Sequence, residues 1–272
     1  MKQRVSWLAW FFYIIGALYF LVPLFGTAIF SLQKRRGELS LAAYQAAFAD
    51  PKFLETFLFS NVMAIFTILA SLLLIVPTAF WVHLRMPKWR SAVEFVTLMP
   101  FVIPAIVLVF GFIKTYSQPV TLLGFTIFPS LTISTFSTNV LLVCGYTVLA
   151  LPYMYRAVDN GLRAMDMRNL TEAAQSLGAG WATILWRVIM PNLRSALLSG
   201  ALLTFAIVVG ELTIASFLAR PAFGPYLAQL GNHMAYEPAA LALATFALTW
   251  VAMGVINLVT SGSKGNPIAG AR

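Results

Sequence analysis

Apolar residues along this chain gather into long runs that are separated by shorter polar segments. Six runs are long enough for helices that cross a bilayer, each of which needs about 20 predominantly apolar residues. We therefore predict an all-α membrane protein that forms a single domain over residues 1–272. The six predicted transmembrane helices cover approximately residues 7–30, 59–81, 93–113, 138–155, 195–218 and 239–258.

The composition agrees with this pattern. Of the 272 residues, 60% are hydrophobic and 10% are charged, and the mean hydropathy is +0.83. A soluble domain carries about 25% charged residues, so a soluble globular protein and a disordered chain are both excluded. The single cysteine, Cys144, lies in an apolar run, and no disulfide can form within the chain.

The first apolar run also resembles a secretory signal peptide, because Lys2 and Arg4 precede it. A signal peptide has an apolar region of only about 7–15 residues and ends at a small-residue cleavage site. This run is nearly twice as long, and the polar segment Gln33 to Arg36 follows it. We interpret it as an uncleaved membrane anchor.

The basic residues predict the orientation in the membrane. The net charge is +9, from 18 Lys and Arg against 9 Asp and Glu. With six spans both termini lie on one side, which carries 12 of the Lys and Arg residues against 6 on the other. The positive-inside rule places both termini and the polar segment 156–187 in the cytoplasm. The excess charge then faces anionic lipid, and no nucleic-acid partner is expected.

Prolines interrupt two of the predicted spans. Pro100 and Pro104 lie in the third span and Pro152 in the fourth, while Pro191 precedes the fifth. A proline inside a helix removes a backbone hydrogen bond and kinks it, whereas one in the first turn costs little. We expect these four residues to shape the helices. A gating hinge is the alternative for those inside the spans.

The polar segment after the fourth span predicts a short amphipathic helix. Asn169 can cap it, and Glu172 stands three residues later, where it can complete a capping box. Gly178 can end the helix in a left-handed turn. This helix either docks in a groove of another protein or packs on its own membrane domain. Its predicted apolar stripe consists of Leu170, Ala173, Ala174 and Leu177.

This segment resembles a signature of a known family. Glu172-Ala173-Ala174, three residues, Gly178, nine residues, Val188, one residue and Met190-Pro191 reproduce the spacing of the EAA motif. That motif is typical of binding-protein-dependent ABC importer permeases, which prefer Ile and Leu where this chain has Val188 and Met190. The six predicted helices and cytoplasmic termini fit the type I importer permease.

The resemblance implies a division of labour between subunits. Residues of approximately 169–187 would form the coupling segment, with Leu170, Glu172, Ala173, Ala174, Leu177 and Gly178 meeting a separate ABC ATPase dimer. ATP and Mg²⁺ would bind to that ATPase, and this chain would hold no cofactor or metal. A second permease subunit, a related chain rather than an identical one, would complete the path. The location would be the bacterial inner membrane.

Glu211 is the acidic residue inside the fifth apolar run, and acidic residues within spans often mark a pathway. The segment Gly210 to Thr213 resembles one in permeases for polyamines, ferric iron, sulfate and phosphonates. Glu211 and Thr213 are therefore candidates for the substrate path, and a paired or capped carboxylate is the alternative. The chain is most similar to the spermidine/putrescine-type group, in which an external binding protein selects the substrate.

Other functions have less support in the sequence. The chain has no GxxxxGK[ST] phosphate loop, no metal-ligand spacing and no GxSxG elbow, so we do not expect an enzyme. A stand-alone ion-coupled carrier or channel is the alternative. A carrier often shows matched repeats and several charges within the membrane, and neither is found here.

Overall fold

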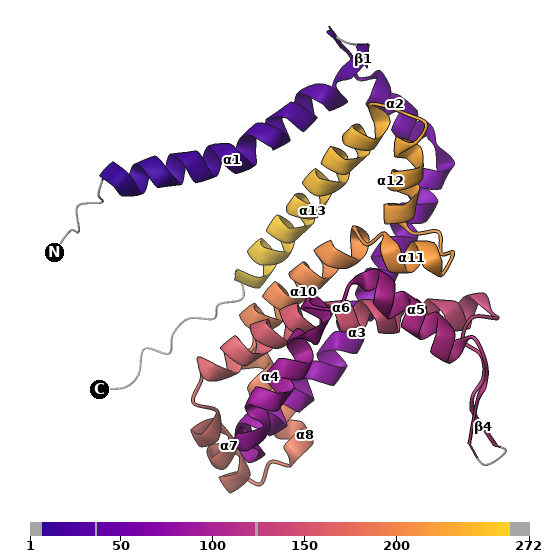
Figure 1. The fold of residues 1–272 in the computed structure, drawn as a ribbon. Helices are drawn as coiled ribbons and strands as arrows, with labels where there is room; N and C mark the ends of the chain where they lie inside the picture. Colours follow the sequence, from indigo (N-terminus) through magenta and orange to yellow (C-terminus); the bar gives the residue numbers. More distant parts are fainter. Residues whose placement is uncertain (1–6, 36, 123–124, 262–272) are drawn as a thin grey trace. The chain divides into compact units, whose positions relative to one another are not determined.

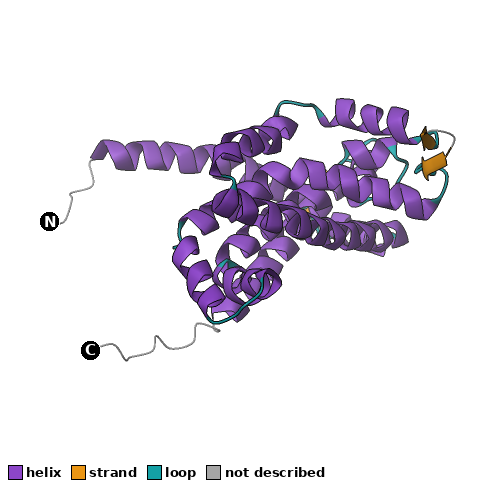
Figure 2. Cartoon of the chain, turned by 90° about the horizontal axis from the view of Figure 1, so that it is seen from below, coloured by secondary structure: helices purple, strands orange, loops and turns teal. Residues whose placement is uncertain are grey.

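The fold is described from a computed structural model, which covers residues 7–35, 37–122 and 125–261. Helices make up most of this part of the chain, and strands occur only as short pieces (Figures 1 and 2). The basic residues Lys2, Arg4, Arg36, Lys264 and Arg272, which entered the orientation count, lie outside the described residues. The chain divides into two compact units. The first unit comprises Met1–Leu54 and Tyr226–Arg272, and the second comprises Glu55–Pro225.

The first unit combines the two ends of the chain. Helix α1 and the short helix α2 both pack against α13. The hydroxyl groups of Ser31 and Tyr44 are 2.9 Å apart, and the rings of Phe30 and Tyr236 lie 4.8 Å apart. The elements of this unit are α1 (Trp7–Ser31), β1 (Gln33–Arg35), β2 (Glu38–Leu39), α2 (Ala42–Ala49) and α13 (Glu237–Ser261).

The second unit contains the predicted coupling segment and Glu211. Its longest helices are α3 (Pro51–Arg85), which begins in the first unit, and α6 (Thr135–Arg163). Between them lie η1 (Pro87–Trp89), α4 (Arg90–Leu98), η2 (Met99–Phe101), α5 (Ala105–Tyr116), β3 (Val120–Leu122) and β4 (Phe125–Phe128). After α6 come α7 (Met167–Ser176), α8 (Trp181–Thr183), the π-helix η3 (Ile184–Ile189), α9 (Met190–Asn192), α10 (Arg194–Val209), α11 (Thr213–Phe217) and α12 (Phe223–Gly231), which ends in the first unit.

The predicted spans are found as helices, but two of them are not single helices. In the described part of the chain, α1, α3 and α6 are long and apolar enough to cross a bilayer. The total is up to five if each of two bent pairs counts as one span, namely Pro87–Phe101 with Ala105–Tyr116 and Trp181–Asn192 with Arg194–Val209. The sixth predicted span lies within α13, of which Glu237–Val251 qualifies as a shorter apolar helix. The predicted helix 195–218 ends at Val209 and resumes as α11.

The prolines differ in their effect on the helices. The third predicted span bends by 99° between η2 and α5. Pro104, with ψ of 139°, stands at the start of α5, and Pro100 lies in η2. By contrast, α6 continues through Pro152 without a break. Pro191 occupies the first turn of the short helix α9, as predicted from its missing amide hydrogen.

Helices α6 and α10 pack together through glycines. A Cβ atom on Gly161 would lie 2.6 Å from the Cβ of Ala196 and 2.7 Å from Leu193 Cδ2. A Cβ atom on Gly200 would lie 2.7 Å from the sulfur of Met154. Small residues allow two helix backbones to approach closely within a membrane. The α6–α10 pair therefore depends on the absence of side chains at these two positions.

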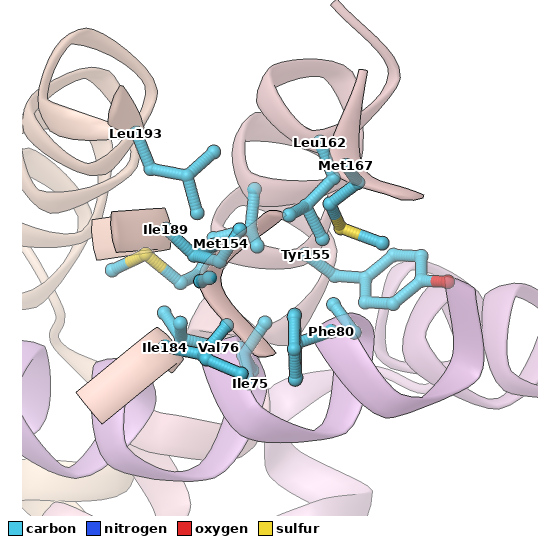
Figure 3. Packing of buried hydrophobic residues seen from close by; sticks show 13 residues of the cluster. Ile75, Val76, Phe80, Met154, Tyr155, Leu162, Met167, Ile184, Ile189 and Leu193 are labelled. Carbon is cyan, nitrogen blue, oxygen red and sulfur yellow. The ribbon is translucent and has the colours of Figure 1, made fainter. Parts of the chain in front are cut away.

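An apolar core joins the elements around the end of α6 (Figure 3). Helix α3 contributes Ile75, Val76 and Phe80, and the π-helix contributes Ile184 and Ile189. The remaining members come from α6, α7 and the turn before α10, namely Met154, Tyr155, Val158, Leu162, Met167, Ala174 and Leu193, with Ala79 from α3. The core fixes α7 to the long helices.

Substitution of Gly161 by alanine tests the α6–α10 contact. Because the new Cβ would overlap Ala196, we expect the free energy of unfolding to fall by about 1–3 kcal/mol, as in other overpacked cores. Gly111→Ala is the matched control, since a Cβ there meets no atom within 4 Å. Thermal unfolding in detergent compares the two variants, and equal stabilities would contradict the close packing.

Candidate functional site

Helix α7 begins earlier than predicted. Asp166, rather than Asn169, is its N-cap, and its Oδ1 accepts a hydrogen bond from the amide of Asn169 at 3.3 Å. The side-chain amide of Asn169 donates to Asp166 Oδ2 at 2.5 Å. Glu172 does not complete a capping box; it pairs instead with Arg168 at 2.9 Å. The hydrogen bond and charge of Glu172 raise the pKa of Arg168.

The two faces of α7 have different surroundings. Met167, Thr171 and Ala174 are buried toward the core. The hydroxyl of Thr171 donates to the carbonyl of Met167 at 2.7 Å, so this polar residue can be buried at 2% exposure. On the outer face, the exposed residues include Arg168, Glu172 and Ala173. Leu177, the C-cap residue directly after α7, is 89% exposed.

The predicted apolar stripe is therefore divided between the two faces. Ala174 lies in the core, Leu170 is half-buried, and Ala173 and Leu177 are exposed. The sequence pattern did not assign Met167 to the helix, because it placed the start at Asn169. With the true start, the buried positions 167, 171 and 174 follow the helical repeat.

The end of α7 is held in a fixed geometry. Gly178 has φ of +81°, as predicted for a left-handed turn. Its amide donates to the carbonyl of Gln175 at 2.8 Å, and the amide of Ala179 donates to the carbonyl of Ala174 at 3.0 Å. These two bonds form a Schellman motif. The turn holds the exposed Leu177 at the tip of the helix.

A polar groove of about 650 Å³ runs beside α7. Its walls include Arg85 from the end of α3, Asp166 and Glu172 from the α7 side, and Trp181 from α8. The guanidinium of Arg85 lies 5.1 Å from the ring of Trp181 and 5.9 Å from that of Trp81. These cation–π contacts restrict the long Arg85 side chain at the edge of the groove.

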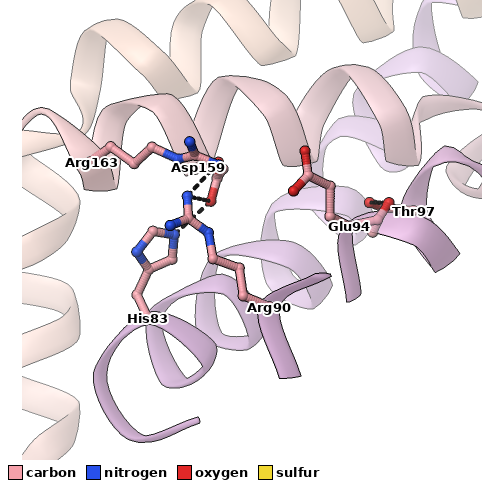
Figure 4. A network of polar contacts seen from close by, with 6 residues as sticks. All are labelled: His83, Arg90, Glu94, Thr97, Asp159 and Arg163. Atoms are coloured by element: carbon pink, nitrogen blue, oxygen red, sulfur yellow. Dashed lines mark hydrogen bonds and ion pairs between the residues drawn. The ribbon is translucent and has the colours of Figure 1, made fainter. Parts of the chain in front are cut away.

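A buried carboxylate lies at the junction of α3, α4 and α6 (Figure 4). Asp159 lies 2.6 Å from His83 Nε2, accepts a hydrogen bond from Arg90 Nη2 at 3.1 Å and forms an ion pair with Arg163 Nη2 at 2.7 Å. The side chain of Asp159 is only 7% exposed. The carboxylate of Asp159 on α6 therefore links side chains from α3, α4 and α6.

Glu211 lies where the fifth predicted span is broken. One carboxylate oxygen accepts from the amides of Thr213 and Ile214 at 2.7 and 3.0 Å, and the other accepts from Ile214 and Ala215 at 3.0 and 3.2 Å. Glu211 is 9% exposed. Its negative charge thus caps the N-terminus of α11, where orphan amides favour an anion. Thr213 contributes its backbone to this cap.

Residues 75–265 match the protein family described as binding-protein-dependent transport system inner membrane component. The chain belongs to this family. It is an inner-membrane permease component of the ABC importers, and the family predicted from the segment Glu172 to Pro191 is confirmed.

Relatives of this permease include polyamine permeases. It is 25% identical over 241 residues to the spermidine/putrescine transport system permease protein PotB homolog of Mycoplasma genitalium, an alignment that covers 85% of this chain and 81% of that protein. It is 27% identical over 146 residues to PotB of Haemophilus influenzae, which covers 52% and 50% of the two chains. For the putrescine transport system permease protein PotI of Escherichia coli the identity is 32% over 109 residues, covering 39% and 38%. The permease thus spans half or less of the last two relatives.

Solved structures share the fold of the permease. A bacterial ABC transporter involved in the import of the acidic polysaccharide alginate contains a chain that matches 95% of this permease and 96% of its own length. The TM-score is 0.70 at 14% identity, which shows the fold alone. An amino acid ABC transporter matches 77% of the permease with a TM-score of 0.53 and 15% identity.

Sequence reasoning missed the carboxylate of Asp159. Asp159 and Arg163 stand four residues apart, the spacing at which opposite charges meet on a helix. That pair could have been found. His83 and Arg90 come from other elements, and only the folded permease brings them to Asp159.

Substitutions of Glu211 distinguish two roles for this residue, namely a cap of helix α11 and a contact with the substrate. We expect Glu211→Gln to lower the free energy of unfolding by about 1–3 kcal/mol, because a charged acceptor of buried amides is weakened. Glu211→Ala should lower the free energy of unfolding further, since three backbone amides lose their hydrogen-bond acceptor. Thermal unfolding measures both. Unchanged stability together with a raised KM for transport would contradict the cap and favour a role in the path.

Proposed function

We propose that this permease forms half of a translocation path and that a separate ABC ATPase drives it through α7. The observation that carries the proposal is the division of α7 into a buried inner face and an exposed outer face. Met167 and Ala174 belong to the apolar core, and Leu177 at the tip is 89% exposed. The helix is thus attached to the permease on one side and accessible to a partner on the other.

The geometry of α7 suits the transfer of a displacement. Its inner face shares a core with Phe80 of α3 and Leu162 of α6. Protein interiors are close-packed and of low compressibility, so a push on α7 moves these helices with it. The Schellman turn at Gly178 keeps the exposed tip in one conformation, which reduces the entropy lost on docking.

The subunit composition follows from the family. Importers of this kind combine permeases with an ATPase dimer, which binds ATP and Mg²⁺, and with a substrate-binding protein. Because relatives of this permease include both PotB and PotC of Haemophilus influenzae, we propose a second, related permease as its partner. In this assembly the chain itself performs no catalytic step. Its EAA-motif segment faces the cytoplasm, and so do both termini.

The proposed substrate is a polyamine or a similar small polar solute. The support lies in relatives whose names include spermidine and putrescine. Glu211 adds little to this choice, because its two oxygens already accept bonds from backbone amides. Selection by the external binding protein is therefore the main determinant in this account.

Replacement of Gly178 by aspartate tests the docking role of α7. A left-handed conformation costs a residue with a side chain up to about 1–2 kcal/mol, and aspartate less than most. We therefore expect this strain together with the new charge to disturb the tip of α7. We expect the permease to insert and fold, to lose the co-purifying ATPase and to lose transport. Affinity purification and uptake assays measure the two losses.

Gly180→Asp is the matched control. A Cβ on Gly178 or on Gly180 meets no atom within 4 Å, and the two glycines differ in φ, at +81° and −75°. The control should retain both the ATPase and transport. Normal transport by the Gly178→Asp variant would disprove docking through this helix.

A further inference from the structure

The Asp159 carboxylate and the basic side chains around it connect parts of the permease that are distant in sequence. His83 stands in the last turn of α3, Arg90 is the first residue of α4, and Arg163 is the last residue of α6. The Asp159 oxygens lie 2.6–3.2 Å from nitrogen atoms of these three side chains. We call these four residues the Asp159 cluster.

Two members of the Asp159 cluster, Asp159 and Arg163, lie in the last turns of α6, just before α7 in the chain. Three residues, Ala164 to Asp166, separate α6 from α7. His83 and Arg163 also line the groove beside α7, together with Glu172. The cluster therefore lies at the base of the helix on which the proposed ATPase acts.

A cleft runs along part of helix α4, although Val93 also packs against the apolar core. This apolar cleft of about 420 Å³ separates part of α4 from α3 and α6, with Val93 and Val96 on one wall and Leu151 on another. Beyond the cleft, the ring of Phe101 in η2 lies 5.1 Å from that of Tyr153 in α6. The start of α4 is held by Arg90 in the Asp159 cluster, and its far end leads into the 99° bend before α5.

We propose that Asp159 is a positioning residue that transmits the displacement of α7 to α4 and to the bent α4–α5 pair. A buried carboxylate cannot leave its cationic partners without a large desolvation penalty, so the Asp159 cluster stays assembled while α7 moves. Arg90 then carries the start of α4 along, and the apolar cleft beside α4 leaves room for this motion. The inference rests on the proposed function, because it requires an ATPase acting at α7.

A label at the bend reports the motion without knowledge of the substrate. Val102 is 82% exposed beside the bend, and Cys144→Ala removes the single cysteine. A spin label on Val102→Cys is measured in the assembled transporter, without nucleotide and with a non-hydrolysable ATP analogue. We expect the spectrum to change on nucleotide binding. With Asp159→Asn the ATPase should still co-purify, and the change at Val102 should fall at least fivefold.

Further variants separate transmission from simple misfolding. Arg90→Gln leaves Asp159 with His83 and Arg163 and should give the same loss, while Asp159→Glu should restore most of the change. Glu94→Gln removes a carboxylate from α4 outside the Asp159 cluster and serves as the matched control. The inference would be overturned if the spectrum at Val102→Cys changed to the full extent on nucleotide binding in both the Asp159→Asn and the Arg90→Gln variants. It would also be overturned if the permease with an unaltered cluster showed no spectral change. Absence of the ATPase from the unaltered permease would instead refute the proposed function.

Discussion

The burial of one face of α7 in the apolar core is the contact on which this account depends. Met167, Thr171 and Ala174 occupy successive turns of that face, and their neighbours come from α3, α6 and the π-helix. Removal of these side chains from water fixes a short helix that would be marginal alone in water. Because the inner face is fixed, the outer face is available for a partner without any loss of attachment.

A second constraint concerns the backbone amides at the break in the fifth predicted span, between α10 and α11. A helix that begins inside an apolar environment leaves its first amide groups without partners, and each such group is costly in a membrane. Glu211 meets this need with two oxygens that accept from three amides. The backbone of Gly224 passes so close that a Cβ there would lie 2.3 Å from the carbonyl oxygen of Glu211. The break is thus a packed feature of the permease fold.

The sequence predicted the elements better than the contacts. Hydrophobic runs located the helices, because length and apolarity are properties of single segments. The glycine turn at Gly178 and the family also followed from local spacing. The bend after η2, the break between Val209 and Thr213, the cap at Asp166 and the Asp159 cluster did not. They depend on which segments pack together, and residues such as His83 and Asp159 are 76 positions apart.

Rigid attachment of α7 is most directly tested by a distance within the permease during the ATP cycle. Gln175 on α7 and Lys88 in η1 are both exposed, and spin labels at these positions on the Cys144→Ala chain report whether α7 moves with the end of α3. The account predicts an unchanged distance between nucleotide-free and ATP-bound transporter, in samples whose transport activity shows that the cycle operates. A shift of more than about 5 Å, one helical turn, would show that α7 moves independently and would contradict the account.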